Sequence, residues 1–91
     1  MYEIFQTNQF KKDLKTIRKR GLKMELLDLV VTSLVEDGKI YPTYKPHKLK
    51  GNYKGYWECH IEPDWLLIWK KDDNLKCIFL TRTGTHSDLF N

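Results

Sequence analysis

The fold is decided by Trp65-Leu66-Leu67-Ile68-Trp69, a run of five apolar residues that no polar side chain interrupts. A strand with one face in water alternates apolar and polar residues, so this unbroken run indicates a strand that is covered on both faces. We expect this strand, extended to Lys70, at the centre of a sheet, with helices over one face and a cleft or a partner over the other.

Three further segments have the pattern of strands. Tyr56 to Ile61 precedes the apolar run, and Lys76 to Thr81 follows it after a short hairpin turn at Asp72-Asp73-Asn74. Near the N-terminus, Tyr2 to Gln6 alternates apolar and polar side chains, as an edge or half-buried strand does. The sequence therefore predicts a mainly antiparallel sheet of about four strands.

Two helices are expected between the first strand and the rest of the sheet. Thr7 is placed to cap the first helix and Gly21 to end it, and the second runs from Lys23 to Glu36 before Gly38. Their apolar stripes consist of Phe10, Leu14 and Ile17 in the first helix and of Leu26, Leu27, Leu29, Val30, Val31, Leu34 and Val35 in the second. Residues 39–46 contain two prolines and are expected to form an irregular connection. The fold class is thus α+β, a single domain over residues 1–91 in which a helical hairpin packs on the sheet.

Positive charge is concentrated in two parts of the chain. The 91 residues include 16 Lys and Arg against 12 Asp and Glu, which gives a net charge of +4. The first cluster contains Lys11, Lys12, Lys15, Arg18, Lys19, Arg20 and Lys23, and the second contains Lys45, Lys48, Lys50 and Lys54. Such clusters attract polyanions such as RNA, although a charge run on a helix is often only its solvated face.

The remaining composition excludes several classes of protein. Two cysteines, Cys59 and Cys77, are too few for a disulfide framework and fit strands as small apolar residues. We find no stretch that resembles a signal peptide, and the longest apolar run, residues 65–69, is far too short to span a bilayer. We therefore expect a cytoplasmic protein that does not associate with a membrane.

Three histidines, His47, His60 and His86, supply groups for acid–base chemistry. RNA carries its own nucleophile, so a ribonuclease needs to take a proton from the 2′-hydroxyl, stabilise the phosphorane and give a proton to the 5′-oxygen. An imidazole suits both proton transfers because its unperturbed pKa is about 6.5. A turn at Pro63 could bring Asp64 back toward His60, where the acid would orient the imidazole; alternatively, the acid only caps the turn.

Other residues could bind the RNA. Arg82 is a candidate clamp for the phosphorane because a guanidinium can donate two parallel hydrogen bonds to phosphate oxygens. Trp65 and Phe90 could stack on unpaired bases. Structural roles are the alternative in each case. Arg82 could pair across strands with Glu58 or Glu62, and both aromatic residues could belong to the core.

A metal site is a further alternative. The side chains of His47, His60, His86, Asp64 and Cys59 include the ligand types of zinc, but their spacings match no compact motif. Cys59 and His60 are adjacent and so point to opposite faces of a strand. We therefore expect neither a metal nor another cofactor.

Four segments together form a family pattern. They are residues 47–56 (HKLKGNYKGY), residues 58–60 (ECH), residues 63–65 (PDW) and residues 82–90 (RTGTHSDLF). These segments resemble the YafQ-like branch of the RelE/ParE toxin superfamily of bacterial toxin–antitoxin systems. Over residues 1–46 the resemblance is one of pattern only, a strand followed by a basic helical hairpin.

The resemblance implies a RelE-like fold and a ribosome-dependent endoribonuclease that cuts translated mRNA. The acid–base set of the family falls on His47, His60, Asp64 and His86, an implicated acid falls on Glu58, and the arginine and terminal aromatic residue fall on Arg82 and Phe90. To these we add candidate RNA contacts at Trp65, Lys48, Lys50 and Lys54 and candidate ribosome contacts at Lys12, Lys15, Lys19 and Lys23.

The resemblance also implies partners. These are the 70S ribosome with its mRNA and a cognate antitoxin, which we expect to be dimeric and DNA-binding, so that operator DNA is bound only through the complex. The antitoxin could fill the histidine cleft or cover the basic hairpin, and the charge of the hairpin favours the second mode. The alternatives are a gyrase inhibitor of the ParE type without catalytic activity and a small domain that binds nucleic acid or a metal. Because every acid–base position is filled, the nuclease is favoured.

Overall fold

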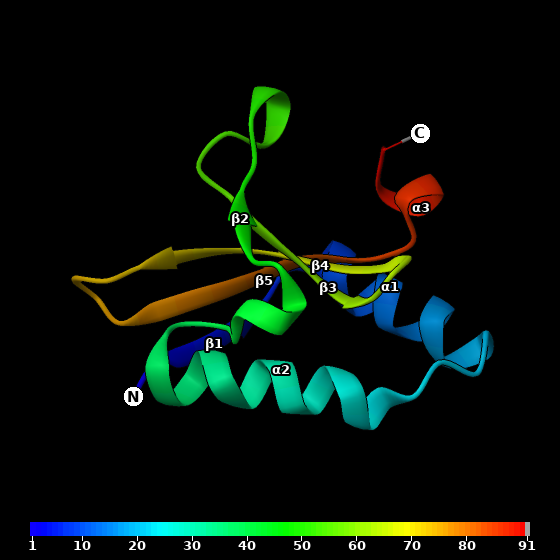
Figure 1. Ribbon diagram of the computed structural model, residues 1–91, viewed down its shortest axis with the longest axis horizontal. Helices are drawn as coiled ribbons and strands as arrows, with labels where there is room; N and C mark the ends of the chain where they lie inside the picture. The colour runs from blue at the N-terminus through cyan, green and yellow to red at the C-terminus, as the bar shows by residue number, and fades with distance from the viewer. Residues whose placement is uncertain (91) are drawn as a thin grey trace.

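The computed structural model describes residues 1–90, in which helices and strands form the expected α+β arrangement (Figure 1). The helices, including two 3-10 helices written η, and the strands follow in the order β1 (Glu3–Gln6), α1 (Asn8–Lys19), α2 (Met24–Asp37), η1 (Pro42–Tyr44), β2 (His47–Lys48), η2 (Gly51–Tyr53), β3 (Trp57–Glu62), β4 (Trp65–Asp72), β5 (Cys77–Gly84) and α3 (His86–Phe90). The predicted initial strand and two-helix hairpin are confirmed.

The sheet has five strands in the order β1-β5-β4-β3-β2. β1 pairs parallel with β5, and the other three pairs are antiparallel, so the prediction of a mainly antiparallel sheet is confirmed. The predicted number of about four strands is one too few. The additional strand, β2, is only two residues long and is therefore too short to show a strand pattern in the sequence.

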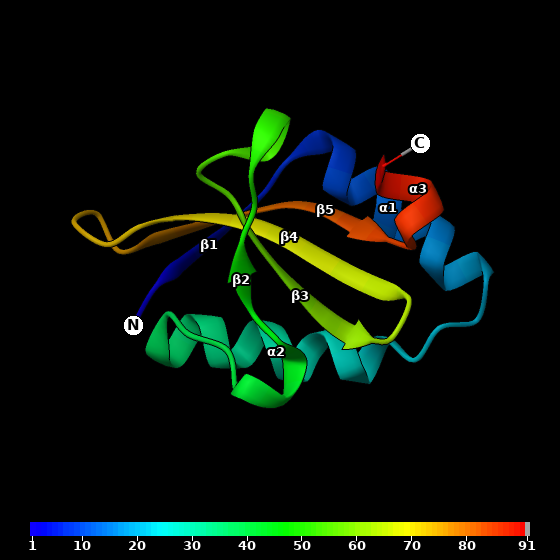
Figure 2. The same cartoon turned by 45° about the horizontal axis from the view of Figure 1, so that its top comes forward.

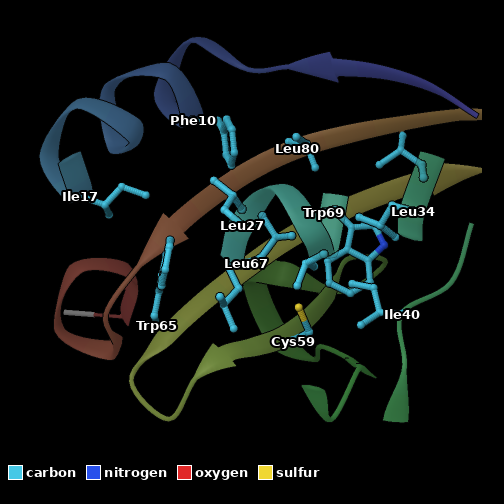
Figure 3. Packing of buried hydrophobic residues seen from close by; sticks show 13 residues of the cluster. Phe10, Ile17, Leu27, Leu34, Ile40, Cys59, Trp65, Leu67, Trp69 and Leu80 are labelled. Carbon is cyan, nitrogen blue, oxygen red and sulfur yellow. The ribbon is translucent and has the colours of Figure 1, made fainter. Parts of the chain in front are cut away.

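β4 lies at the centre of the sheet, as its apolar run predicts (Figure 2). Each residue from Trp65 to Trp69 is at most 2% exposed. On one face of the sheet, Leu67 and Trp69 belong to a single core with Phe10 of α1 and Leu34 of α2 (Figure 3). Fully burying one such side chain contributes about 1.5–3 kcal/mol, so this core is the main source of stability.

The opposite face of the sheet is covered by the chain itself. Leu66 and Ile68 pack against Leu89 of α3 and against Leu49 and Tyr56, which flank η2. Both covering segments stand on the side of the sheet away from α2 (Figure 1). The expectation of a cleft or a partner over this part of β4 is therefore wrong, because two short segments without an amphipathic pattern supply the cover.

The helices begin and end close to the predicted residues. Thr7 Oγ1 accepts a hydrogen bond from the backbone N–H of Phe10 at 3.0 Å, and Gly38 ends α2 in the left-handed conformation with a φ of 66°. Leu29 departs from the predicted stripe, because it lies on the solvent side of α2 and is 60% exposed. Within residues 1–90, no helix combines the length and the apolar character needed to cross a membrane.

Candidate active site

Three histidines from three different elements lie in one row. The ring centroids of His47 in β2 and His60 in β3 are 6.2 Å apart, and those of His60 and His86 in α3 are 5.9 Å apart. His47 pairs with the residue two positions before His60, so both side chains lie on the same face of the sheet. His86 joins them because His60 pairs with Leu66, Leu66 pairs with Gly84, and α3 begins two residues after Gly84.

Asp64 pairs with His86 and not with His60. Its Oδ1 accepts a hydrogen bond from the backbone N–H of His86 at 3.0 Å and lies 2.7 Å from Nδ1 of the same residue. These bonds, the backbone one first, lower the pKa of Asp64. His60 Nδ1 instead lies 3.3 Å from the carbonyl oxygen of Pro63. The predicted contact of Asp64 with His60 is wrong because the turn places the acid beside the start of α3, where a backbone N–H needs an acceptor.

Glu58 lies buried beside His47. It is 5% exposed, and its Oε1 lies 3.3 Å from Nε2 of His47, whose Nδ1 lies 3.0 Å from the carbonyl oxygen of Lys45. Both nitrogens of the His47 ring therefore lie next to hydrogen-bond acceptors. An imidazole that carries a proton on each nitrogen can donate a hydrogen bond to both of them. The second oxygen of Glu58, Oε2, is buried and has no hydrogen-bond partner within residues 1–90. A buried acceptor left in this state costs stability.

Arg82 is held by an acid that the sequence analysis did not select. Its Nε and Nη2 donate to Oδ2 and Oδ1 of Asp13 in α1 at 2.8 and 3.3 Å, and these hydrogen bonds raise the pKa of the guanidinium. The predicted pairing of Arg82 with Glu58 or Glu62 is therefore wrong, because the guanidinium reaches toward α1. The sequence did contain a signal: Asp13 lies on the apolar stripe of its helix, where an acid needs a partner.

Trp65 cannot stack on RNA, contrary to our prediction. It is 1% exposed, and its indole N–H donates to Oγ1 of Thr83 at 2.9 Å. Thr83 Oγ1 in turn donates to the carbonyl oxygen of Leu66 at 2.8 Å. Trp65 is thus part of the core, and its one polar atom is satisfied there.

Phe90 remains available at the surface. It is 47% exposed, and its ring centroid lies 6.3 Å from that of His86 and 5.8 Å from that of Tyr53. Next to it is a groove of about 470 Å³ lined by Lys50, Asn52, Tyr53, Leu89 and Phe90. Sequence reasoning missed Tyr53, although an aromatic residue between the glycines of a basic loop was the available signal.

The candidate lysines are exposed but lie on different sides of the molecule. Lys50 lines the groove beside Phe90, and Lys54 is exposed in the same connection. Lys48 is directed away from the histidines, because it follows His47 on the strand and its Nζ lies 5.5 Å from the ring centroid of Trp57 on the helix-covered face. The structure therefore does not bring Lys48 into the site. The exposed lysines of the helical region include Lys12, Lys15, Lys19 and Lys23.

The short helix that carries His86 is tied to α1. Asp88 forms a two-point ion pair with Arg20, in which Nη2 donates to Oδ1 at 2.9 Å, and this partner lowers the pKa of Asp88. Asp88 also accepts from the backbone N–H of Thr85 at 2.9 Å, while its own N–H donates to Oγ1 of Thr85 at 3.1 Å. Gly84 has a φ of 155°, and a Cβ there would lie 2.8 Å from Oδ2 of Asp88. These contacts fix the start of α3 and with it the position of His86.

Within residues 1–90, no three side chains of His, Cys, Asp or Glu are grouped so that they could hold a metal ion. Cys59, one of the possible zinc ligands, is buried in the core, and burial raises the pKa of its thiol to about 12. Neither Cys59 nor Cys77 forms a disulfide. Acid–base groups, an arginine and exposed aromatic rings are thus the chemical resources of this face.

Comparison with known proteins decides the family. A family model described as "Bacterial toxin of type II toxin-antitoxin system, YafQ" matches residues 2–91. The chain belongs to this family. The mRNA interferase toxin YafQ of Escherichia coli (strain K12) is 42% identical over 89 residues, which cover 97% of this chain and 95% of that protein.

Solved structures of similar toxins agree with the fold. The crystal structure of YafQ from Escherichia coli strain BL21(DE3) has a TM-score of 0.91 at 38% identity and covers all of both chains. The toxin in a crystal structure of the Escherichia coli DinJ-YafQ complex has a TM-score of 0.89 at 39% identity, also over all of both chains. A metal-bound toxin from Helicobacter pylori has a TM-score of 0.89 at 41% identity and covers 99% of this chain and 100% of that one.

Proposed function

We propose that this YafQ-family toxin is an mRNA interferase that cuts mRNA on the 70S ribosome and thereby inhibits translation. The observation that carries the proposal is the row of three imidazoles. Two of them are paired with acids, His86 with Asp64 and His47 with Glu58. The name of the Escherichia coli relatives, mRNA interferase toxin, supports the same activity.

The proposed reaction is a phosphoryl transfer within the RNA. The 2′-oxygen attacks the neighbouring phosphorus and gives its proton to a base. The bond from phosphorus to the 5′-oxygen then breaks, and this oxygen takes a proton from an acid. The products are a 2′,3′-cyclic phosphate and a 5′-hydroxyl. Because the RNA supplies the nucleophile, acid–base groups are sufficient, and we propose that the reaction needs neither a metal-activated water nor another cofactor.

The imidazoles carry the two proton transfers in this proposal. Nδ1 of His86 is hydrogen-bonded to Asp64, and Nδ1 of His60 lies next to the carbonyl oxygen of Pro63. Nε2 of each ring therefore remains available to bind a proton. His47 lies between two acceptors, which suits a proton donor. General acid–base catalysis of this kind typically contributes a factor of about 10² to 10⁴ in rate.

RNA binding is assigned to the groups around the row. Arg82 would stabilise the phosphorane with the N–H groups that Asp13 does not occupy, since charge on the phosphoryl oxygens grows in the transition state. Phe90 and Tyr53 would stack on unpaired bases, with Lys50 and Lys54 close to the backbone phosphates.

The basic helices are proposed to bind partners. The exposed side chains of Lys12, Lys15, Lys19 and Lys23 would meet rRNA phosphates. The DinJ-YafQ complex of the relative supports a cognate antitoxin. We propose that such an antitoxin is a DNA-binding dimer, covers the basic helices, leaves the histidine row partly open, and links the toxin to operator DNA. Ribosomes and antitoxin would both be met in the cytoplasm.

Cleavage of mRNA in a purified translation system tests the proposal. The wild-type toxin should cut mRNA that is being translated and leave free mRNA intact, and His86→Ala should lower the rate by about 10² to 10⁴. Circular dichroism should show that this variant is folded. Absence of cleavage by the wild-type toxin, or inhibition of gyrase in place of translation, would contradict the proposal.

A further inference from the structure

Asp13 is the one acid in α1, and it is placed against the sheet. It is 8% exposed and lies on the same side of the helix as Phe10 and Ile17, which are fully buried. A buried carboxylate is costly unless it is hydrogen-bonded, and here four N–H groups donate to it. Two come from Arg82, one comes from the backbone of Thr83 at 3.1 Å, and one comes from Gln9 at 3.1 Å.

The two bonds to Arg82 use one particular edge of the guanidinium. Asp13 accepts hydrogen bonds from Nε at 2.8 Å and from Nη2 at 3.3 Å. These two nitrogens form the edge of the planar group that includes the nitrogen joined to the side-chain stem. The end formed by Nη1 and the second hydrogen of Nη2 takes no part in these bonds. Tyr53, which lies beside Phe90, also interacts with the guanidinium and adds to the rise in its pKa after Asp13, so the phosphate would meet Arg82 next to this tyrosine. Arg82 pairs with Ile68 in the sheet, and Ile68 pairs with Glu58, so the arginine starts from the face of the sheet that carries the histidine row.

We propose that Asp13 is a positioning residue that holds the Arg82 guanidinium by its inner edge and so leaves its outer end for the scissile phosphate. The proposal rests on the phosphate-binding role assigned to Arg82 above. A free arginine side chain has several rotatable bonds, and holding it before the substrate arrives removes that freedom from the catalytic step. The side chain of Arg82 is only 21% exposed, so most of it is packed against the protein and does not extend into solvent.

Asp13 could alternatively have a purely structural role, in which it satisfies a backbone N–H of β5. β1 pairs with β5 only from Cys77 to Leu80, so the N–H of Thr83 lies beyond the paired part of this edge. Asp13 satisfies that N–H and would be needed for folding even if Arg82 did no chemistry. The two roles differ in one measurable respect. Only in the positioning role does the effect of an Asp13 substitution on the cleavage rate depend on the presence of Arg82.

The first test measures the cleavage rate of mRNA on ribosomes at saturating ribosome concentration, together with the ribosome concentration that gives half of that rate. Asp13→Asn should lower the saturating rate by about tenfold to hundredfold, less than the about 10²- to 10³-fold loss expected when a group that stabilises transition-state charge is removed. The half-saturating concentration should stay the same, because the exposed lysines are unchanged. Asp28→Asn, which removes an exposed acid from α2, is the matched control and should keep the parent rate.

The second test combines the variants. If Asp13 acts through Arg82, Asp13→Asn should lower the rate by less than about twofold in an Arg82→Ala background, because groups that act as a unit are not additive. A full further loss in that background would show a structural role and overturn the inference, as would the parent rate for Asp13→Asn alone. The parent rate for Arg82→Ala would instead overturn the role of Arg82 itself, and the inference with it.

A third variant keeps the question decidable if Asp13→Asn does not fold. Arg82→Lys leaves Asp13 and its bond to Thr83 in place and keeps the positive charge. A compact ammonium group, however, lacks the planar shape by which a guanidinium can bind Asp13 along one edge and a phosphate at its other end. It should lose about tenfold to hundredfold in saturating rate, as Asp13→Asn does. The parent rate for Arg82→Lys would show that the orientation of the guanidinium is not needed and would overturn the inference.

Discussion

Asp64 and His86 form the shortest side-chain contact of the histidine row, at 2.7 Å between Oδ1 and Nδ1. The pKa of Asp64 is lowered by the hydrogen bonds that it accepts from His86, so the acid is ionised throughout the neutral range. A carboxylate in this position holds the Nδ1–H tautomer of the imidazole and stabilises the ring when it gains a second proton.

Asp64→Asn should therefore lower the rate of mRNA cleavage by about 10² or more, although asparagine can still accept the backbone N–H of His86. The rate would be measured on ribosomes at saturating concentration. Glu62→Gln changes an exposed acid next to the same turn and serves as the control. Parent activity in a folded Asp64→Asn variant would exclude Asp64 from the proton transfer.

Trp65 offers the opposite case, a residue that we predict to matter for stability alone. Trp65→Phe removes the indole N–H that Thr83 Oγ1 accepts, and the smaller ring leaves a gap in the core. The free energy of unfolding in urea should fall by about 1–3 kcal/mol. The cleavage rate well below the melting temperature should stay within about twofold of the parent, because the side chain is out of reach of RNA. A large loss of cleavage in a stable variant would restore the stacking role.

At the scale of residues, the sequence identified three candidate histidines, which the structure brings together, but not their partners. Residue type and the family pattern were sufficient to make His47, His60 and His86 candidates, because few other groups can transfer protons near neutrality. The pairs Asp64–His86 and Arg82–Asp13 join residues that are 22 and 69 positions apart. Such pairs depend on which strand ends and helix faces meet, and no local pattern encodes this.

At the scale of elements, α1 holds the C-terminal segment in place. The pKa of Asp88 is lowered on folding, mainly by the hydrogen bonds from Arg20, so the ionised acid stabilises the fold above its unfolded-state pKa of about 3.9. This contribution is lost as the pH falls below that value. The ion pair therefore stabilises the attachment of α3 at neutral pH and weakens in acid.

Arg20→Gln should loosen α3 and displace His86 and Phe90. We expect the cleavage rate to fall by about tenfold to hundredfold, since a displacement of about 1 Å can cost about 10²-fold. The drop in melting temperature between about pH 6 and about pH 2 should be smaller in the variant than in the parent. Arg18→Gln, near the end of the same helix, is the control. An unchanged rate together with an unchanged pH dependence would show that the ion pair does not position α3.

The long elements were predictable and the short ones were not. The two helices and the strands β3, β4 and β5 have several turns or residue pairs in which periodicity can be seen. β2 has two residues and α3 has five, yet these elements carry His47 and His86. Their positions follow from the register with β3 and from the contacts of Asp88 and Asp64, which arise only when the whole sheet is assembled.

At the scale of the whole molecule, the cationic side of α1 faces away from the sheet. Lys12, Lys15 and Lys19 are exposed and are spaced by three and four residues, so they share one side of the helix. The opposite side carries Phe10, Asp13 and Ile17 against the sheet. One helix thus presents exposed lysines outward and holds Arg82 inward.

Replacing Lys12, Lys15 and Lys19 together with glutamine should weaken ribosome binding and flatten its dependence on salt, because fewer counterions are released from rRNA. Lys39, Lys70 and Lys76 are also exposed, and their replacement removes the same charge elsewhere. Binding would be measured by cosedimentation at several salt concentrations. Equal weakening in both triple variants would mean that net charge, and not the α1 surface, controls docking.

The chemical nature of the cut ends tests the central claim most directly. Fragments of mRNA cleaved on ribosomes would be isolated and their termini identified by mass spectrometry, with and without a chelator that removes transition metals but leaves the magnesium required by ribosomes. An acid–base mechanism that uses the 2′-hydroxyl predicts 5′-hydroxyl ends and 2′,3′-cyclic phosphate or 3′-phosphate ends in both samples. Ends that carry a 5′-phosphate, or cleavage that stops when the chelator is added, would contradict it and indicate a metal-activated water.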